Sequence, residues 1–290
     1  MVTRSPTGNR RDTITVGVDG SAESLNAAAW AAREARRRGM ALQVVHVDDG
    51  PPHPTGLREL DAPAGRERGT LDSAIRALTH GNPSGDIIAG TLTGPPAPAL
   101  VNAARESAAL VVGSRGRTAL EGFLVGSVAL AVTAKALCPV VLIRAPRPRR
   151  FLPRRAAPEP VVVGVDLDHS CDAVLAQAFT AAALREAPVI VVHAWSVPLL
   201  KDTSSGIPEP ETTKRRQLSE VVGPWLSKYP HTPVTERLVH STAGHTLRES
   251  GESAGLLVLG RRTNPAERLG RTLHSVIHHV HCPVFVVPHE

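Results

Sequence analysis

The chain is poor in aromatic residues, which make up 3% of its 290 residues. Its cores must therefore be built from Val, Leu, Ile and Ala, and a nucleic-acid surface would lack rings on which bases stack. No run approaches the roughly 18 apolar residues of a membrane span, and the polar start MVTRSPTGNRRDT does not resemble a secretory signal. We therefore expect a cytoplasmic protein with neither a membrane nor a nucleic acid as its partner.

Cysteine is also scarce. Cys138, Cys171 and Cys282 are odd in number, widely spaced and without a CxxC pair, which disfavours a disulfide framework and predicts reduced structural thiols. His274 and His278 lie four residues apart on a predicted helix, near two further histidines, a spacing that resembles metal ligands. No carboxylate or cysteine is obviously placed to complete that set, so we expect surface or interface histidines and no metal.

The net charge of +6 and the pI near 9.9 could indicate a polyanionic partner. Much of the excess lies in the N-terminal tail and in the segment RAPRPRRFLPRRAAPEP, residues 144–160. A segment this dense in proline and arginine is typical of a stiff, solvated linker, and this interpretation is favoured over a nucleic-acid-binding arm.

The linker divides two halves that repeat one another. The motifs VGVD, VVH and ALVVG (LLVLG in the second half) recur at a constant distance, so that Asp166 lies 147 residues after Asp19. The motif CPV recurs after only 144 residues, from Cys138 to Cys282, so the second half has lost three residues before it. The repeat predicts two domains, 12–146 and 160–290, joined by a linker at 147–159.

Each half alternates short apolar runs with helical patterns. The strands expected in the first half are Ile14–Asp19, Leu42–Val47, Asp86–Thr91, Leu110–Gly113 and Val140–Arg144. The helices expected between them are Ser21–Arg38, about Arg66–Thr79, Pro95–Ser107 and Val125–Leu137, with Ser21 as a cap and Gly39 as a stop. This βαβ alternation predicts a doubly wound α/β fold with a five-stranded parallel sheet in each half.

The segment GSRGRTALEGFLVGS, residues 113–127, follows the fourth predicted strand. Its glycines would let backbone N–H groups approach an anion, and Gly126 and Ser127 open a helix whose N-terminus attracts phosphate. Arg115 and Arg117 could add charge-assisted bonds or be ordinary solvated charges. Ser127 could donate to a phosphate oxygen or simply cap the helix. The segment is neither a Walker A loop nor a GxGxxG dinucleotide fingerprint.

Along the first half the motifs VGVDGS, VVHV, VVGSRG, GS and CPVVLI follow one another, with nine residues between VVGSRG and GS. This order of motifs, with the repeat, resembles the universal stress protein family in its tandem two-domain form. The pattern G-x2-G-x9-G-[ST] of the nucleotide-binding members is met by Gly113, Gly116, Gly126 and Ser127. The resemblance covers nearly the whole chain. It implies a flavodoxin-like strand order, 3-2-1-4-5, and regulators of stress responses that act as dimers rather than efficient enzymes.

The resemblance also implies a ligand, ATP, alone or with Mg²⁺, and the residues around it. Adenine and ribose would lie near Gly17, Asp19 and Val47. The phosphates would lie near Gly113, Ser114, Arg115, Gly116, Arg117, Gly126, Ser127 and Val128. Asp19 could instead only cap the first helix, but its place at the end of a strand favours ligand contact.

The second half departs from the pattern. Thr263 stands at the place of the second glycine, and alignment from CPV puts Arg271 opposite Ser127. We therefore predict a degenerate or weak nucleotide site there. Its equivalent residues are Gly164, Asp166, Gly260, Arg261, Gly270 and Arg271.

Three classes of function stay open at this stage. The first is a nucleotide-binding regulator, favoured by the intact first loop. The second is a slow ATPase or nucleotidyl transferase, disfavoured because no nucleophile with an adjacent base and no set of carboxylates for magnesium is visible. The third is a scaffold that binds no nucleotide and works through an unknown protein partner.

The resemblance predicts an intramolecular pseudo-dimer, alone or within a homodimer, with the closing strands Val140–Arg144 and Val284–Pro288 near each other. An apolar strand at a sheet edge needs covering, which gives the physical reason. Cross-linking of the intact protein is expected to join these two segments, and the absence of any cross-link between the halves would contradict the prediction.

Overall fold

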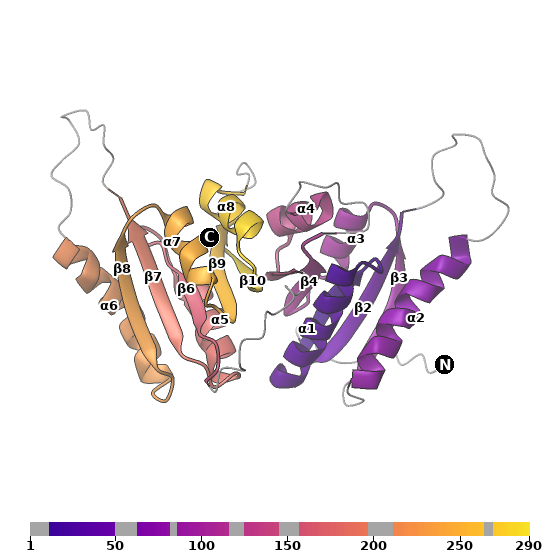
Figure 1. The fold of residues 1–290 in the computed structure, drawn as a ribbon, viewed down its shortest axis with the longest axis horizontal. Coiled ribbons are helices and arrows are strands. Elements are labelled where there is room, and N and C mark those ends of the chain that lie inside the picture. Colours follow the sequence, from indigo (N-terminus) through magenta and orange to yellow (C-terminus); the bar gives the residue numbers. More distant parts are fainter. Residues whose placement is uncertain are drawn as a thin grey trace. The chain divides into compact units, whose positions relative to one another are not determined.

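The computed structural model describes residues 12–49, 63–81, 86–115, 125–144, 157–196, 211–263 and 269–290. The chain divides into two compact units, residues 1–148 and 149–290. The elements of both units are labelled in Figure 1.

The first unit is a five-stranded parallel sheet in the order β3-β2-β1-β4-β5. Its elements are β1 (Thr13–Val18), α1 (Ala22–Arg38), β2 (Ala41–Asp48), α2 (Pro63–Gly81), β3 (Ile87–Thr93), α3 (Pro96–Ala103), β4 (Ala109–Gly113), α4 (Ser127–Lys135) and β5 (Val140–Ile143). The predicted fold class and strand order are confirmed.

The second unit repeats this arrangement with the order β8-β7-β6-β9-β10, again with parallel pairs. Its elements are β6 (Val161–Gly164), α5 (Asp172–Ala183), β7 (Val189–Trp195), α6 (Glu211–Lys228), β8 (Val234–His240), α7 (Ala243–Gly251), β9 (Leu256–Arg262), α8 (Arg271–His279) and β10 (Val284–His289).

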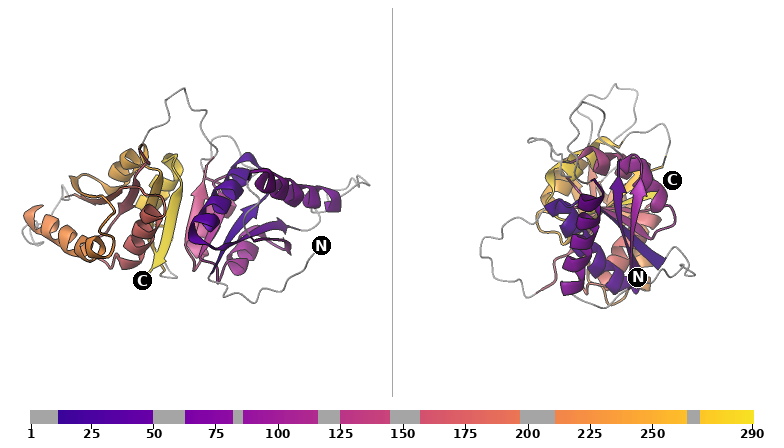
Figure 2. Two further views of the ribbon diagram at one scale, coloured as in Figure 1. Left: turned by 90° about the horizontal axis from the view of Figure 1, so that it is seen from below. Right: turned by 90° about the vertical axis from the view of Figure 1, so that its right-hand side faces the viewer.

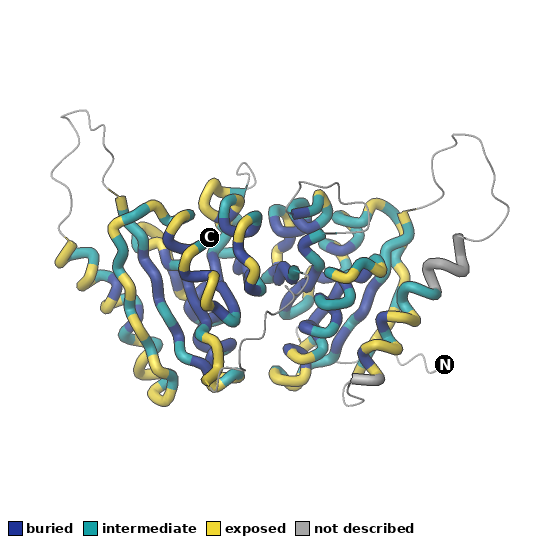
Figure 3. Tube along the Cα trace, in the orientation of Figure 1, coloured by how far each residue is buried: buried dark blue, intermediate teal, exposed yellow. Residues whose placement is uncertain are grey.

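Helices cover both faces of each sheet. In the first unit α1 packs against α2, β1 and β4, whereas α3 and α4 pack against each other on the opposite face. In the second unit α5 contacts α6, and α7 contacts α8 (Figure 2). Burial on both faces explains why the central strands are continuous runs of Val, Leu and Ile rather than alternating patterns (Figure 3).

The predicted boundaries of the first helix are confirmed at both ends. Ser21 is the N-cap of α1, and its side chain accepts a hydrogen bond from the Ser24 N–H. Gly39 ends the helix in the left-handed conformation, with φ of 65°, which glycine adopts without steric cost.

The cysteines and the helix lengths bear on two further expectations from the sequence. Cys138, Cys171 and Cys282 are free and buried, as predicted for structural thiols. Among the described helices, none combines the length and the apolar character needed to cross a membrane.

Candidate functional site

Hydrogen bonds tie Asp19 to the beginning of α1. The Asp19 Oδ1 atom accepts from the Ser21 N–H at 2.9 Å and lies 2.6 Å from the Ser21 Oγ. The same Ser21 Oγ lies 3.5 Å from the carbonyl oxygen of Arg115. Asp19 is therefore not itself the cap of α1, and it stands at the carboxyl edge of the sheet beside the segment that follows β4.

The two ends of the glycine-rich segment are also fixed. The Ser114 N–H donates to the Ile143 carbonyl at 2.7 Å, and the Ser114 carbonyl accepts from the Gly126 N–H at 2.7 Å. Ser114 itself is buried. These bonds bring Asp19, the end of β4 and the beginning of α4 to one edge of the first sheet, as predicted.

Gly126 is the N-cap of α4 and Ser127 is its first helical residue. The expectation that Ser127 could cap the helix is therefore wrong, because the cap position belongs to the residue before it. Ser127 is exposed and Val128 half-buried. The first N–H groups of a helix have no partner within the helix, so α4 directs donors and a positive dipole end toward this edge.

Two glycines of the first unit allow a helix to pack closely on a strand. A Cβ on Gly113 would lie 2.9 Å from the backbone of Glu23 and Ser24, so glycine lets α1 approach β4 closely. A Cβ on Gly17 would lie 3.0 Å from a Leu100 methyl group, so this glycine makes room for α3. Val47 is half-buried near the end of β2. Gly116 and Arg117 lie outside the described residues.

The second unit differs from the first where its first strand is connected to its first helix. Helix α5 begins at Asp172, eight residues after β6 ends at Gly164, whereas α1 begins four residues after β1 ends at Val18. The later start removes a helical turn from the position that Ala22 and its neighbours occupy in the first unit.

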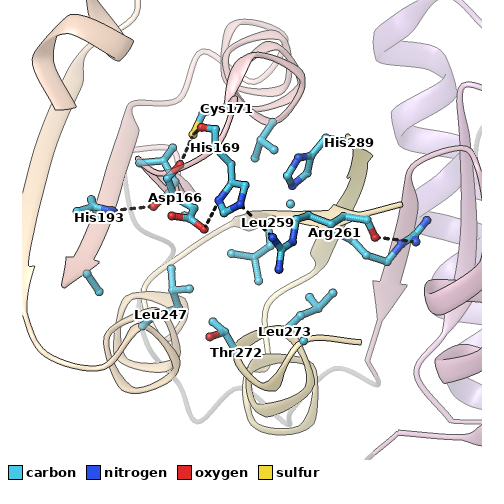
Figure 4. Close-up of a pocket in the computed structure, with 18 of the residues that line it drawn as sticks. Asp166, His169, Cys171, His193, Leu247, Leu259, Arg261, Thr272, Leu273 and His289 are labelled. Carbon is cyan, nitrogen blue, oxygen red and sulfur yellow. Dashed lines mark hydrogen bonds and ion pairs between the residues drawn. The ribbon is translucent and has the colours of Figure 1, made fainter. Parts of the chain in front are cut away.

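A cavity of about 460 Å³ lies at the equivalent edge of the second unit (Figure 4). Its volume falls within the roughly 300–1,000 Å³ typical of small-molecule sites. Aliphatic side chains, among them Val165, Val192 and Leu247, form part of the lining. The lining also includes all six residues predicted for the second site: Gly164, Asp166, Gly260, Arg261, Gly270 and Arg271. The structure therefore brings them together, while their contact with a ligand stays a prediction.

Three side chains form a chain of contacts within the cavity lining. The Asp166 Oδ2 atom lies 3.0 Å from His169 Nδ1, and His169 Nε2 lies 3.0 Å from a guanidinium nitrogen of Arg262. Asp166 and His169 belong to the segment between β6 and α5, and Arg262 ends β9. His169 was not predicted from the sequence because its counterpart in the first half, Ala22, begins a helix, and Arg262 was not predicted although its counterpart, Arg115, was.

Cys171 also lines the cavity and ends this segment. Its Sγ lies 3.1 Å from the Asp166 carbonyl oxygen. Burial raises the pKa of the Cys171 thiol, and the charges of Asp166 and Asp172 act in the same direction. Cys171 therefore stays a neutral thiol near pH 7 and is a poor nucleophile.

Two histidines, on strands β7 and β10, also line the cavity. His289 covers Gly260, where a Cβ would lie only 2.5 Å from the His289 Nε2 atom. His193 is 7% exposed, its Nδ1 lies 3.0 Å from the Val165 carbonyl oxygen, and its Nε2 is buried without a hydrogen-bond partner. His46 makes the equivalent contact in the first unit, to the Val18 carbonyl at 2.8 Å.

The histidines near the C-terminal end of the sequence do not assemble a metal site within the described residues, where no three His, Cys, Asp or Glu side chains are grouped to hold an ion. His274 and His278 instead pack against each other on α8, with ring centroids 4.4 Å apart.

Comparison with known proteins identifies relatives along nearly the whole chain. The sequence profile of the universal stress protein family matches residues 10–144 and 158–288. Universal stress protein Rv2005c of Mycobacterium tuberculosis is 31% identical over 292 residues, which cover 94% of this chain and 96% of the relative. Universal stress protein Rv2623 of the same organism is 29% identical and covers 88% of each chain.

The fold is shared with solved structures as well. The crystal structure of a universal stress protein from Archaeoglobus fulgidus superposes with a TM-score of 0.68 over 95% of this chain and 96% of that one, at 18% identity.

Proposed function

The chain belongs to the universal stress protein family, and we propose that it is a stress-response regulatory protein whose first domain binds ATP. One observation carries the proposal. Hydrogen bonds bring Asp19, the Gly113–Arg115 turn and the N-terminus of α4 to a single edge of the sheet. In doubly wound sheets this carboxyl edge is where nucleotides bind.

Each part of this edge has a role that suits an adenine nucleotide. The N–H groups of Ser127 and Val128 and the dipole of α4 suit the phosphates, because helix N-termini favour anions. Arg115, half-buried beside them, adds a guanidinium for charge-assisted bonds. Asp19 can accept hydrogen bonds from ribose hydroxyls, and Gly17 and Val47 would line the adenine side. ATP would bind alone or with Mg²⁺, which would offset phosphate charge.

The second site is proposed to bind ATP weakly or not at all. Arg271 occupies the first helical position of α8, where the first unit has Ser127. The Thr263 N–H donates to the His289 carbonyl at 2.9 Å, which ties the residue after β9 to β10, and Thr263 stands where the first half has the second glycine of the motif.

Two measurements on the intact protein test the proposal. Mass spectrometry of the denatured protein is expected to detect a co-purified adenine nucleotide. Calorimetry on nucleotide-free protein is expected to give one tight ATP site per chain. A protein that releases no nucleotide and gives no heat with ATP would instead be a scaffold, and two equivalent tight sites would contradict the asymmetry.

A further inference from the structure

Strand β3 lies at an edge of the first sheet and lacks the features that usually block such an edge. Among the described residues, β2 is the one strand paired with it. Natural edge strands commonly carry a charge, a proline or a bulge, which discourages pairing with another chain. The sequence of β3, IIAGTLT, has no charge and no proline, and its pairing with β2 is unbroken from Ile87 to Thr93. The edge is therefore suited to accept another strand.

The hydrogen bonds to β2 show which backbone groups of β3 point outward. The Leu42 N–H donates to the Asp86 carbonyl just before the strand, and the Gly94 N–H donates to the Asp48 carbonyl just after it, both at 2.9 Å. Residues that bond to one neighbouring strand alternate along a parallel ladder, so the even-numbered residues of β3 bond to β2. The outward N–H and C=O groups belong to the odd-numbered residues, which are Ile87, Ala89, Thr91 and Thr93.

A second copy of β3 can satisfy all of these outward groups. The copy runs antiparallel to the first strand and is related to it by a two-fold axis at Gly90. Ile87 then lies opposite Thr93 of the second copy, and Ala89 lies opposite Thr91. Each of these pairs exchanges two hydrogen bonds, as directly opposed residues with facing N–H and C=O groups do. The backbone of β3 is therefore complementary to itself in this register.

The same register covers the exposed apolar side chain of the strand. Ile88 is 41% exposed and lies opposite Leu92 of the second copy. This is a non-hydrogen-bonded pair, in which the Cα atoms lie only about 4.5 Å apart and the side chains contact each other. Gly90 faces its own copy, and a Cβ on Gly90 would meet nothing within 4 Å in the single chain. The side chains therefore suit the pairing that the backbone requires.

The equivalent strand of the second unit carries a charge where β3 has none. Strand β8 follows β3 by the 147 residues of the repeat, so Arg237 stands at the place of Gly90. The Val189 N–H donates to the Pro233 carbonyl, which gives β8 the same alternation of inward and outward groups. The same two-fold pairing of β8 would set Arg237 directly against Arg237, and like charges in opposed positions destabilise a strand pair. The chain thus blocks self-pairing at β8 but not at β3.

We propose that two copies of the chain associate through β3, paired antiparallel about Gly90, so that one sheet continues from the first unit of one copy into the first unit of the other. Strand β3 is the opposite edge of the first sheet from β5, so this interface is separate from the pairing expected of the closing strands. It does not depend on ATP binding. One strand from each copy buries less than the roughly 1,200 Å² of a standard interface, so the complex is weak and reversible.

Sedimentation equilibrium of the intact protein is expected to show self-association with a dissociation constant of about 1–100 μM. Gly90→Arg gives β3 the residue that stands in β8 and should weaken association at least about tenfold. Gly90→Thr is the matched control, because threonine adds a side chain without charge and pairs well with itself across strands. This variant should associate at least as tightly as the wild type, and circular dichroism checks the folding of both.

Two results of this experiment would overturn the proposal. One is a wild-type chain that shows no association up to about 300 μM, which would leave the edge to another occupant or to water. The other is self-association that Gly90→Arg leaves unchanged, which would place the contact on a different surface.

A cysteine at the two-fold axis tests the register in a variant that keeps the pairing. In Gly90→Cys the two Cα atoms would lie about 4.5 Å apart, within the range of about 4.4–6.8 Å that a disulfide spans. Oxidised glutathione is expected to join the two copies through this bond, since Cys138, Cys171 and Cys282 are buried. In the control Thr91→Cys the two residues lie diagonally, about 7–8 Å apart, and should cross-link at least about tenfold more slowly. No cross-link at position 90, or equal rates at both positions, would contradict antiparallel pairing about Gly90.

Discussion

Replacement of Gly126 by valine is expected to weaken ATP binding to the first unit at least tenfold while that unit stays folded. Gly126 has φ of −75° and ψ of 158°, a conformation open to any residue, so valine fits the backbone. Its branched side chain would stand where phosphate must approach the N–H groups of α4. Loss of one or two charge-assisted bonds of about 1.5–3 kcal/mol each weakens affinity by about tenfold or far more.

The chain offers a matched control at Gly270, which caps α8 with φ of −55° and ψ of 150°. A Cβ there would contact nothing within 4 Å. Gly270→Val therefore carries the same capping penalty as Gly126→Val but should leave the tight ATP site unchanged. Calorimetry on both variants, with circular dichroism for folding, separates the possibilities. Unchanged ATP affinity in folded Gly126→Val would show that the phosphates lie elsewhere.

The repeat and the hydrophobic pattern were sufficient to predict the architecture. The aliphatic runs ending at Val18, Gly113 and Ile143 become strands β1, β4 and β5, because runs buried on both faces contain few polar interruptions. The caps Ser21 and Gly39 were predictable because each acts through its own local chemistry. The strand order was predicted only from the resemblance to a family, because the residues of a strand do not determine which strands lie beside it in the sheet.

The second cavity was only partly predictable. Its glycines and Arg271 were found by alignment with the first half, but His169 and His289 were not. His169 lies in a segment that is helical in the first unit, so the repeat placed no functional residue there. His289 on β10 contacts Gly260 only in the folded sheet, so the spacing of residues along the sequence does not predict that contact. Side chains that meet across strands are set by the folded sheet rather than by local pattern.

Gly113→Ala is expected to destabilise the first unit by about 1–2 kcal/mol. Its Cβ would lie 2.9 Å from the Glu23 carbonyl carbon and the Ser24 nitrogen. These are backbone atoms at the start of α1, so the helix itself must shift, and overpacking of this kind costs about 1–3 kcal/mol. Reduced freedom of the unfolded chain returns about 0.4–1 kcal/mol. The same shift would displace Ser21, and with it Asp19, from the proposed nucleotide site.

The equivalent change in the second unit, Gly260→Ala, should be close to neutral. The new Cβ would meet the imidazole of His289, the end of a side chain that can rotate away, and a Val174 methyl group at 3.2 Å. Two positions 147 residues apart thus differ because one faces backbone and the other faces side chains. Denaturant unfolding, followed by amide hydrogen exchange in each unit, measures both changes. Equal destabilisation by the two substitutions would mean that the backbone of α1 does not lie within 2.9 Å of the Cβ position of Gly113.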